Sequence, residues 1–352
     1  MKTLQLDSQD QYQAELANQL SALIELRAYA LAVDNTDLSA GSGAIPSGLF
    51  NTLNNNLNTI KNHANYCTNT LIPQMNAVPN SLVTCGQKFG DTANQILGLW
   101  RFHEGTSIDS DMKEAILDLL GTLKGIVNEQ KSNIQTLHSD FSTFQVDADG
   151  DLTQLVDNVN DIQNQVNADK NVISQLNSDI AEAKSRIASD RSLITKLSIA
   201  QGLSAAAGCG ILGFGGMFIG GMVSGGLTDS IYRDRQDINN AQNTIARDQA
   251  QLPKERQYIT SLTVVQSSMN DLATLNRNMK SSLNEIADWW QSVETKLSNI
   301  LEDIQDASLD SNWDWLKDDV NMAKQEWQNL LNFATNMQNI SQNAEVKVFR
   351  AP

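Results

Sequence analysis

The sequence contains few residues that interrupt helices and few positive charges. Only 5 of its 352 residues are proline and 6% are aromatic, a composition that favours helix. Its 25 lysines and arginines are outnumbered by 41 aspartates and glutamates, for a formal net charge of -16. Because phosphate binding draws on clustered basic side chains, this charge argues against nucleic acid as a partner. Any affinity for a membrane must come from apolar residues and not from attraction to anionic lipid.

The sequence also lacks a secretory signal and a disulfide framework. The N-terminus turns polar at Asp7, before any apolar core of a cleavable signal could form, so we expect a protein that stays in the cell or leaves by another route. Three cysteines are too few for a framework of disulfides. Cys67 and Cys85 could pair across a loop expected between Pro73 and Pro79, but two buried free thiols are the favoured interpretation.

Patterns that signal catalysis or cofactor binding are incomplete. Gly208, Gly210 and Gly213 spell GxGxxG, but the βαβ unit that this motif needs is missing around it. Residues 147–151 open like a calcium loop, yet leucine replaces the required turn glycine at position 152. We expect a helix interruption there, with Asp151 capping the next helix. We therefore predict no enzyme activity, no cofactor and no metal site.

Apolar residues recur at spacings of three and four through most of the chain, which predicts amphipathic helices. A connector rich in proline and asparagine is expected after Pro73. A second break is expected between Asp306 and Asn312. The expected helices cover about 8–33, about 50–73, a short piece near 96–100, a stretch capped within 107–111 that runs to 144, heptad-bearing segments up to 304, and a last helix over 313–340.

One stretch differs from the rest. Residues 197–228, which we call the tip, contain no charged side chain and hold ten of the chain's 20 glycines. A helix needs about 20 apolar residues to cross a ~30 Å hydrocarbon core, so the tip is a candidate for membrane insertion. The side chains predicted to enter the membrane are Leu203, Ile211, Leu212, Phe214, Met217, Phe218, Ile219, Met222, Val223 and Leu227.

Heptad repeats flank the tip on both sides. Apolar residues stand seven apart over 152–194 and again over 231–259, which is the pattern of coiled-coil seams. If the tip crossed a bilayer once, these two arms would lie on opposite sides of it and lose each other as partners. We therefore expect antiparallel arms and a hairpin tip, which could be a short β-hairpin before insertion. The turn is expected at one of two glycine pairs, Gly215 with Gly216 or Gly220 with Gly221.

This layout of heptad arms around an uncharged tip resembles the α-helical pore-forming toxins of the cytolysin A type. It is more closely similar to components of the bacterial tripartite haemolysin and enterotoxin systems. The resemblance implies an all-α fold, an elongated bundle of about five long helices with a hydrophobic head that is often a β-tongue in the soluble state. It implies a tail formed by residues 1–144 and 262–352, a neck formed by 145–196 and 229–261, and a head at 197–228.

The resemblance also implies a role. Such a protein is secreted, here without a cleavable signal peptide, and then assembles on a target-cell bilayer with homologous helical subunits as a hetero-oligomer. Because the tip offers few polar groups to line a channel, we predict that this chain is the membrane-engaging subunit. The alternative is a secretion-associated coiled-coil translocator or a structural protein that contacts membranes.

Overall fold

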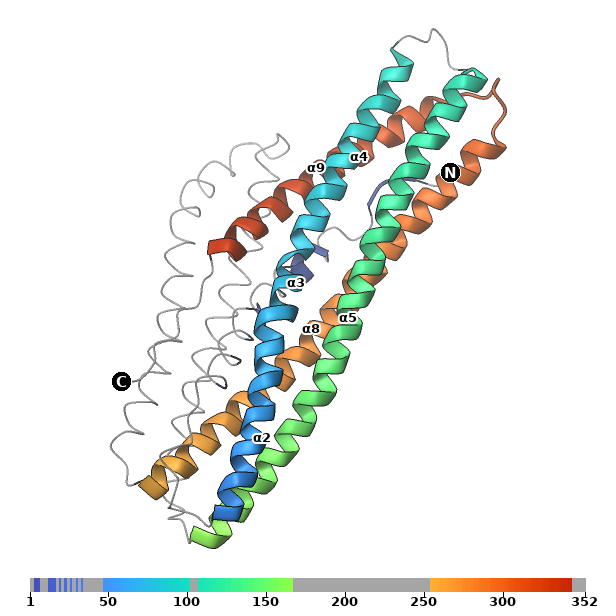
Figure 1. The fold of residues 1–352 in the computed structure, drawn as a ribbon. Helices are drawn as coiled ribbons and strands as arrows, with labels where there is room; N and C mark the ends of the chain where they lie inside the picture. The colour runs from blue at the N-terminus through green and yellow to red at the C-terminus, as the bar shows by residue number, and fades with distance from the viewer. Residues whose placement is uncertain are drawn as a thin grey trace.

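The computed structural model describes residues 3–6, 12–16, separate positions between 19 and 33, and the ranges 47–101, 107–166 and 254–343. Within these ranges the chain is an elongated bundle of helices and contains no strand (Figure 1). The predicted all-α class is therefore confirmed. The helices in chain order are α2 (Ser47–Tyr66), the π-helix η2 (Cys67–Leu71), α3 (Ile72–Asn76), α4 (Val78–Trp100), α5 (Ser110–Val166), α8 (Lys254–Asp306) and α9 (Asp314–Asn343).

The connector predicted after Pro73 is wrong, because α2, η2, α3 and α4 follow one another with only Ala77 between the last two. Pro73 has no N–H to continue an α-helix, and the chain passes it through one π-helical turn in which Ile72 N–H bonds to Cys67 O. Pro79 lies in the first turn of α4, where a missing N–H costs nothing. Both prolines are thus accommodated, and helix continues where a loop was expected.

Helix α5 begins where the sequence predicted and continues further than predicted. The Oδ1 atom of Asp109 accepts a hydrogen bond of 2.7 Å from Met112 N, which caps the first turn. The interruption predicted at residues 147–151 is wrong, since these residues lie inside α5, which runs to Val166. Their short polar side chains are stabilised by neighbouring helices, as described below.

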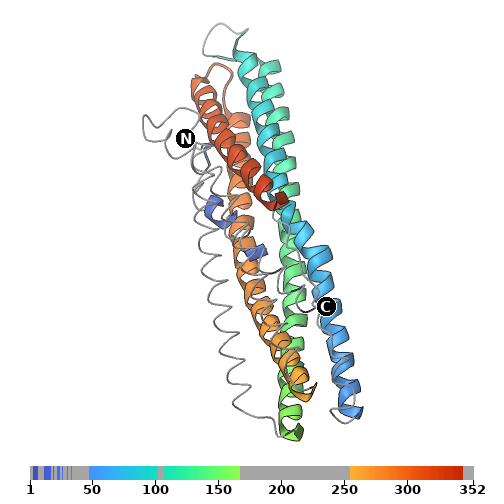
Figure 2. The ribbon, with the colours of Figure 1, turned by 90° about the vertical axis from the view of Figure 1, so that its left-hand side faces the viewer.

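Helices α5 and α8 form the longest interface of the bundle and run antiparallel (Figures 1 and 2). Their polar contacts show the opposite directions of the two helices. Lys113 on α5 meets the carbonyl of Gln305, and Gln145 near the other end of α5 meets Asn276. The apolar positions of both helices point into one core, which explains why two helices of more than fifty residues remain paired over most of their length.

The break predicted at residues 306–312 is confirmed, since α8 ends at Asp306 and α9 begins at Asp314. Trp313 is fully buried at this corner and donates a hydrogen bond from its indole nitrogen to Ser308 O at 3.2 Å. Lys113 donates to the carbonyls of Gln305 and Ala307, which have no partner within the helix that ends there. From this corner α9 turns back and packs against α4 (Figure 1).

Candidate functional site

The predicted membrane-inserting side chains and turn glycines all fall between residues 203 and 227, outside the residues that the structure describes. The GxGxxG pattern lies in the same stretch. Among the described helices, none is both long enough and apolar enough to cross a bilayer. The described part of the site is consequently the pair of helices that leads into the tip and out of it.

These two helices end and begin at the same end of the bundle. Figure 1 shows the last turns of α5 and the first turns of α8 close together at the lower end, opposite the α8–α9 corner. Residues 167–253, which contain the tip, leave from the end of α5 and return at the start of α8. The arms predicted over 152–194 and 231–259 lie mostly outside the described residues, which include only 152–166 and 254–259 of them.

A buried amide joins α5 to α8. Asn276 has no exposed surface, and its Nδ2 donates hydrogen bonds to Phe141 O at 2.9 Å and to Gln145 Oε1 at 2.7 Å. It lies in a series of apolar residues at alternating spacings of three and four, between Leu272 and Met279. A buried polar pair in such a seam fixes how two helices align, because sliding either helix would bury the amides without partners. Asn276 is the single polar residue inside this apolar series, and that departure from the pattern is the signal by which the sequence could have predicted a buried polar contact here.

A second set of polar contacts lies on the same stretch of α5. Asp151 is buried and its Oδ2 lies 2.7 Å from Nδ1 of His63 on α2. Burial raises the pKa of the Asp151 carboxyl, against the hydrogen bond and charge of His63, which lower it, and with Asp147, which raises it further. Asp149, two residues earlier, pairs at 2.5 Å with Arg277 of α8. The acidic residues that resemble a calcium loop therefore bind two neighbouring helices.

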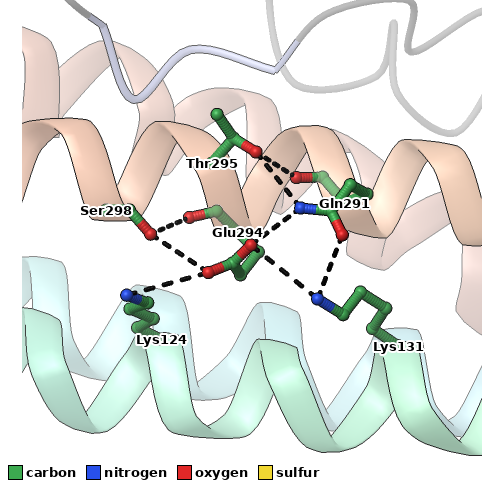
Figure 3. Close-up of polar contacts among 6 residues, drawn as sticks. All are labelled: Lys124, Lys131, Gln291, Glu294, Thr295 and Ser298. Atoms are coloured by element: carbon green, nitrogen blue, oxygen red, sulfur yellow. Dashed lines mark hydrogen bonds and ion pairs between the residues drawn. The ribbon is translucent and has the colours of Figure 1, made fainter.

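Nearer the α8–α9 corner, Glu294 of α8 is held by side chains from both helices (Figure 3). Its carboxylate accepts hydrogen bonds from Ser298 at 3.1 Å and Gln291 at 2.8 Å, and it lies 3.7 Å from Lys124 and 3.8 Å from Lys131 of α5. Burial raises the pKa of Glu294, but these hydrogen bonds and the two lysine charges outweigh it, so the pKa is lowered overall.

Two cysteines and a pair of tryptophans among the described residues are part of the core. Cys67 and Cys85 are buried free thiols, as the favoured interpretation held, so the disulfide considered between them is not formed. Burial raises the pKa of Cys85 to about 12 and that of Cys67 still further, which keeps both thiols protonated and unreactive. Trp289 and Trp290 pack against each other with ring centroids 4.9 Å apart, in the core and not in a docking patch.

Comparison with known proteins places the chain in a family. The sequence profile of the Bacillus haemolytic enterotoxin (HBL) family matches residues 7–190, more than half of the chain. The chain belongs to the Bacillus haemolytic enterotoxin family. The predicted resemblance to components of tripartite toxins is thereby confirmed. No curated protein matches the sequence.

Solved structures of such components share the fold of this enterotoxin-family chain. A Bacillus cereus HblL1 toxin component has a TM-score of 0.67 at 15% identity, covering 96% of this chain and 97% of that one. Soluble SmhB of the tripartite alpha-pore forming toxin Smh from Serratia marcescens has a TM-score of 0.64 at 15% identity, with coverages of 94% and 92%. The SmhB pore has a TM-score of 0.57 at 18% identity, with coverages of 93% and 98%. At these identities the likeness shows the fold alone.

Proposed function

We propose that this chain is the membrane-engaging subunit of a multi-component α-helical pore-forming toxin. One observation carries the proposal: in a member of the haemolytic enterotoxin family, the segment of chain that joins an antiparallel helix pair at one end contains a stretch of 32 residues without a charge. Such a stretch is stable in water only if it is covered, and stable in lipid without cover. The subunit is soluble until the tip leaves its cover and enters a target membrane.

The proposed division of the chain assigns each part a task. The tail, residues 1–144 and 262–352, keeps the subunit folded in water. The neck, residues 145–196 and 229–261, holds the two ends of the head together. The head, residues 197–228, inserts through the ten apolar side chains named above and turns at one of its two glycine pairs. On α5, Gln145 and Asp151 make their buried contacts close to the proposed boundary at residues 144 and 145, which supports a role for these contacts in aligning the helices that lead to the head.

The proposed partners are a target-cell bilayer and homologous helical subunits. SmhB is solved both as a soluble protein and as a pore, and this chain shares the fold of both forms. We therefore infer that it too exists in a soluble state and an assembled one, as part of a hetero-oligomer on the membrane. It reaches the membrane after secretion. The activity is physical insertion, and no bond-making step is invoked.

The test of insertion is a charge in the middle of the tip. Phe218→Glu should weaken binding to phosphatidylcholine liposomes on the order of 100-fold, because an ionised carboxylate deep in a bilayer costs about 2.5–3.5 kcal/mol. Binding is measured by co-sedimentation. The matched control is Gln135→Glu, which adds the same charge at an exposed position of α5 and should leave binding unchanged. If the Phe218 variant bound liposomes as well as the intact chain, the tip would not enter the membrane and the proposal would be wrong.

The assignment to one subunit of several has its own test. Red cells should lyse when this chain is mixed with its two partner subunits, and the chain alone should bind liposomes without releasing their contents. Stable ion-conducting channels formed by the purified chain alone in planar bilayers would contradict the assignment, since the tip would then be lining a channel without a partner.

A further inference from the structure

Residues 3–6, which we call the strap, stand near the start of the sequence and dock on α8 and α9 near its other end. Leu4 and Leu6 are buried, while Thr3, which precedes them, and Gln5, which stands between them, are half-buried. Alternation of this kind is the pattern of an extended chain with one face against a surface. The strap therefore binds as a short peptide would, with two leucines as its apolar contacts.

The surface that holds the strap recognises its main chain. Asp319 Oδ2 accepts a hydrogen bond of 2.7 Å from Leu4 N, and Glu326 Oε2 accepts one of 2.6 Å from Leu6 N. Both partners are carboxylates, which makes these bonds stronger than those between neutral groups. Lys296 of α8 donates to Gln5 O between them. Two N–H groups and one carbonyl of a four-residue segment are thus paired with side chains.

Side chains add specificity to this main-chain recognition. Asp319, Met322 and Glu326 are spaced by three and four residues and share one face of α9. Asp319 also accepts a hydrogen bond from the Thr3 hydroxyl, and the Gln5 side-chain amide lies 3.2 Å from the sulfur of Met322. Main-chain bonds combined with alternate buried side chains are the means by which proteins bind extended peptides in general. We name Lys296 and these three residues of α9 the strap site.

We propose that the strap site also binds the strap of a second copy of this chain, so that adjacent subunits exchange straps when they assemble. The proposal rests on the proposed function only in requiring that copies come to lie side by side. An exchanged strap makes the same hydrogen bonds and buries the same leucines as a strap bound within its own chain. Exchange of an identical element therefore costs no contacts, and the balance depends on effective concentration alone.

The length of the connection limits which copy can be reached. Tyr12, the first described residue after the strap, stacks on Trp289 of α8 with ring centroids 4.1 Å apart, and Glu15 accepts a hydrogen bond of 2.7 Å from Ser282. The five residues between strap and Tyr12 extend at most roughly 20 Å. A single chain in dilute solution therefore fills its own site, and another copy competes with it only when it lies directly adjacent, in an assembly or in concentrated solution.

The recognition step can be tested without assembly. A fluorescent peptide of residues 1–7 should bind the full-length variant Leu4→Ala/Leu6→Ala, whose own strap is weakened, at least about tenfold more tightly than the intact chain, whose strap competes at high effective concentration. Adding Asp319→Asn and Glu326→Gln to that variant should abolish binding. A peptide of the same composition with its leucines adjacent is the control. No binding to a variant with the circular dichroism of the intact chain, or binding that ignores the Asp319 and Glu326 changes, would overturn the proposal.

Exchange itself can be tested by cross-linking, with Cys209→Ser in every chain. A chain with Gln5→Cys is mixed with one carrying Met322→Cys, in concentrated solution and on phosphatidylcholine–cholesterol vesicles, and treated with a short bis-maleimide. Cross-linked dimers should form in both and exceed, by at least about tenfold on vesicles, those from a mixture in which Lys317→Cys, exposed on another face of α9, replaces Met322→Cys. The double variant of one chain should cross-link internally.

Two results would overturn exchange: a failure of the internal cross-link, or intermolecular dimers no more abundant than in the Lys317 control in either condition. Release of vesicle contents, recorded with the partner subunits present, keeps the two proposals apart. Dimers without release would support exchange and count against the toxin function, and release without dimers would do the reverse.

Discussion

The two ends of the described bundle differ in what fills their cores. On the side of the bundle toward the α8–α9 corner, aromatic rings from several elements meet: Phe89 of α4 stacks on Trp327 of α9 at 5.1 Å, and Trp327 lies 5.9 Å from Trp289 of α8. Toward the tip, Asn276 and Gln145 are buried between α5 and α8, and Asp151 of α5 is buried beside His63 of α2. An aromatic core contributes stability through buried area, whereas buried amides and carboxylates contribute alignment at a cost in desolvation. One end is built to stay folded, and the other is built to hold two helices in register.

The largest effect should come from the aromatic end. Trp327→Ala removes a ring that is 1% exposed and should lower the free energy of unfolding by about 3–5 kcal/mol, because a cavity replaces it. Trp315→Ala is the matched control on α9, since Trp315 is only partly buried and should cost less than half as much. Urea unfolding followed by circular dichroism measures both. Equal losses would mean that the rings do not form a shared core.

A smaller effect is expected from the buried amide pair. Asn276→Leu deprives Gln145 Oε1 of its donor and should cost about 1–3 kcal/mol in the free energy of unfolding. The double change Gln145→Leu/Asn276→Leu should recover at least half of that loss, because no buried polar group is then left unpaired. Asn270→Leu, at an exposed position of α8, is the control and should be near neutral. If the double variant were less stable than both the intact chain and Asn276→Leu, the amides would be contributing stability and not alignment.

The smallest effects are expected from two carboxylates, Asp151 and Glu294, whose contributions to stability should depend on pH in opposite directions. Because the pKa of Asp151 is raised above its ordinary 3.8, its contribution to stability is greatest in acid and declines as the pH rises through the raised pKa. Because the pKa of Glu294 is lowered below its ordinary 4.5, its contribution is present above that pH and is lost as the pH falls through the lowered pKa.

Asp151→Asn should therefore remove a decline of stability with rising pH, and Glu294→Gln should remove an increase, each within about 1 kcal/mol. Urea unfolding at a series of pH values from acid to neutral measures the two slopes, with the intact chain as the reference. Slopes that change in the same direction for both variants would contradict the opposite environments described for the two carboxyls.

Much of the fold could be predicted from the sequence, for reasons that are local. The break at residues 306–312, the cap of α5 near Asp109 and the helical class follow from spacing and capping, which neighbouring residues determine. The two errors have one cause. Pro73 and the acidic residues 147–151 are signals of interruption in a short window, but a π-helical turn passes the first, and His63 and Arg277 from other helices stabilise the second.

By itself, the sequence determined the helical class, the heptad arms and the uncharged stretch between them, because spacing and the absence of charge act over a few turns of chain. Only the tertiary structure decided which polar residues are buried and what they bind. Asn276 meets Gln145 across 131 positions, and Leu4 meets Asp319 across 315. Such partners are brought together by the packing of the whole bundle, and a pattern read along the chain carries no information about which distant residue will lie opposite.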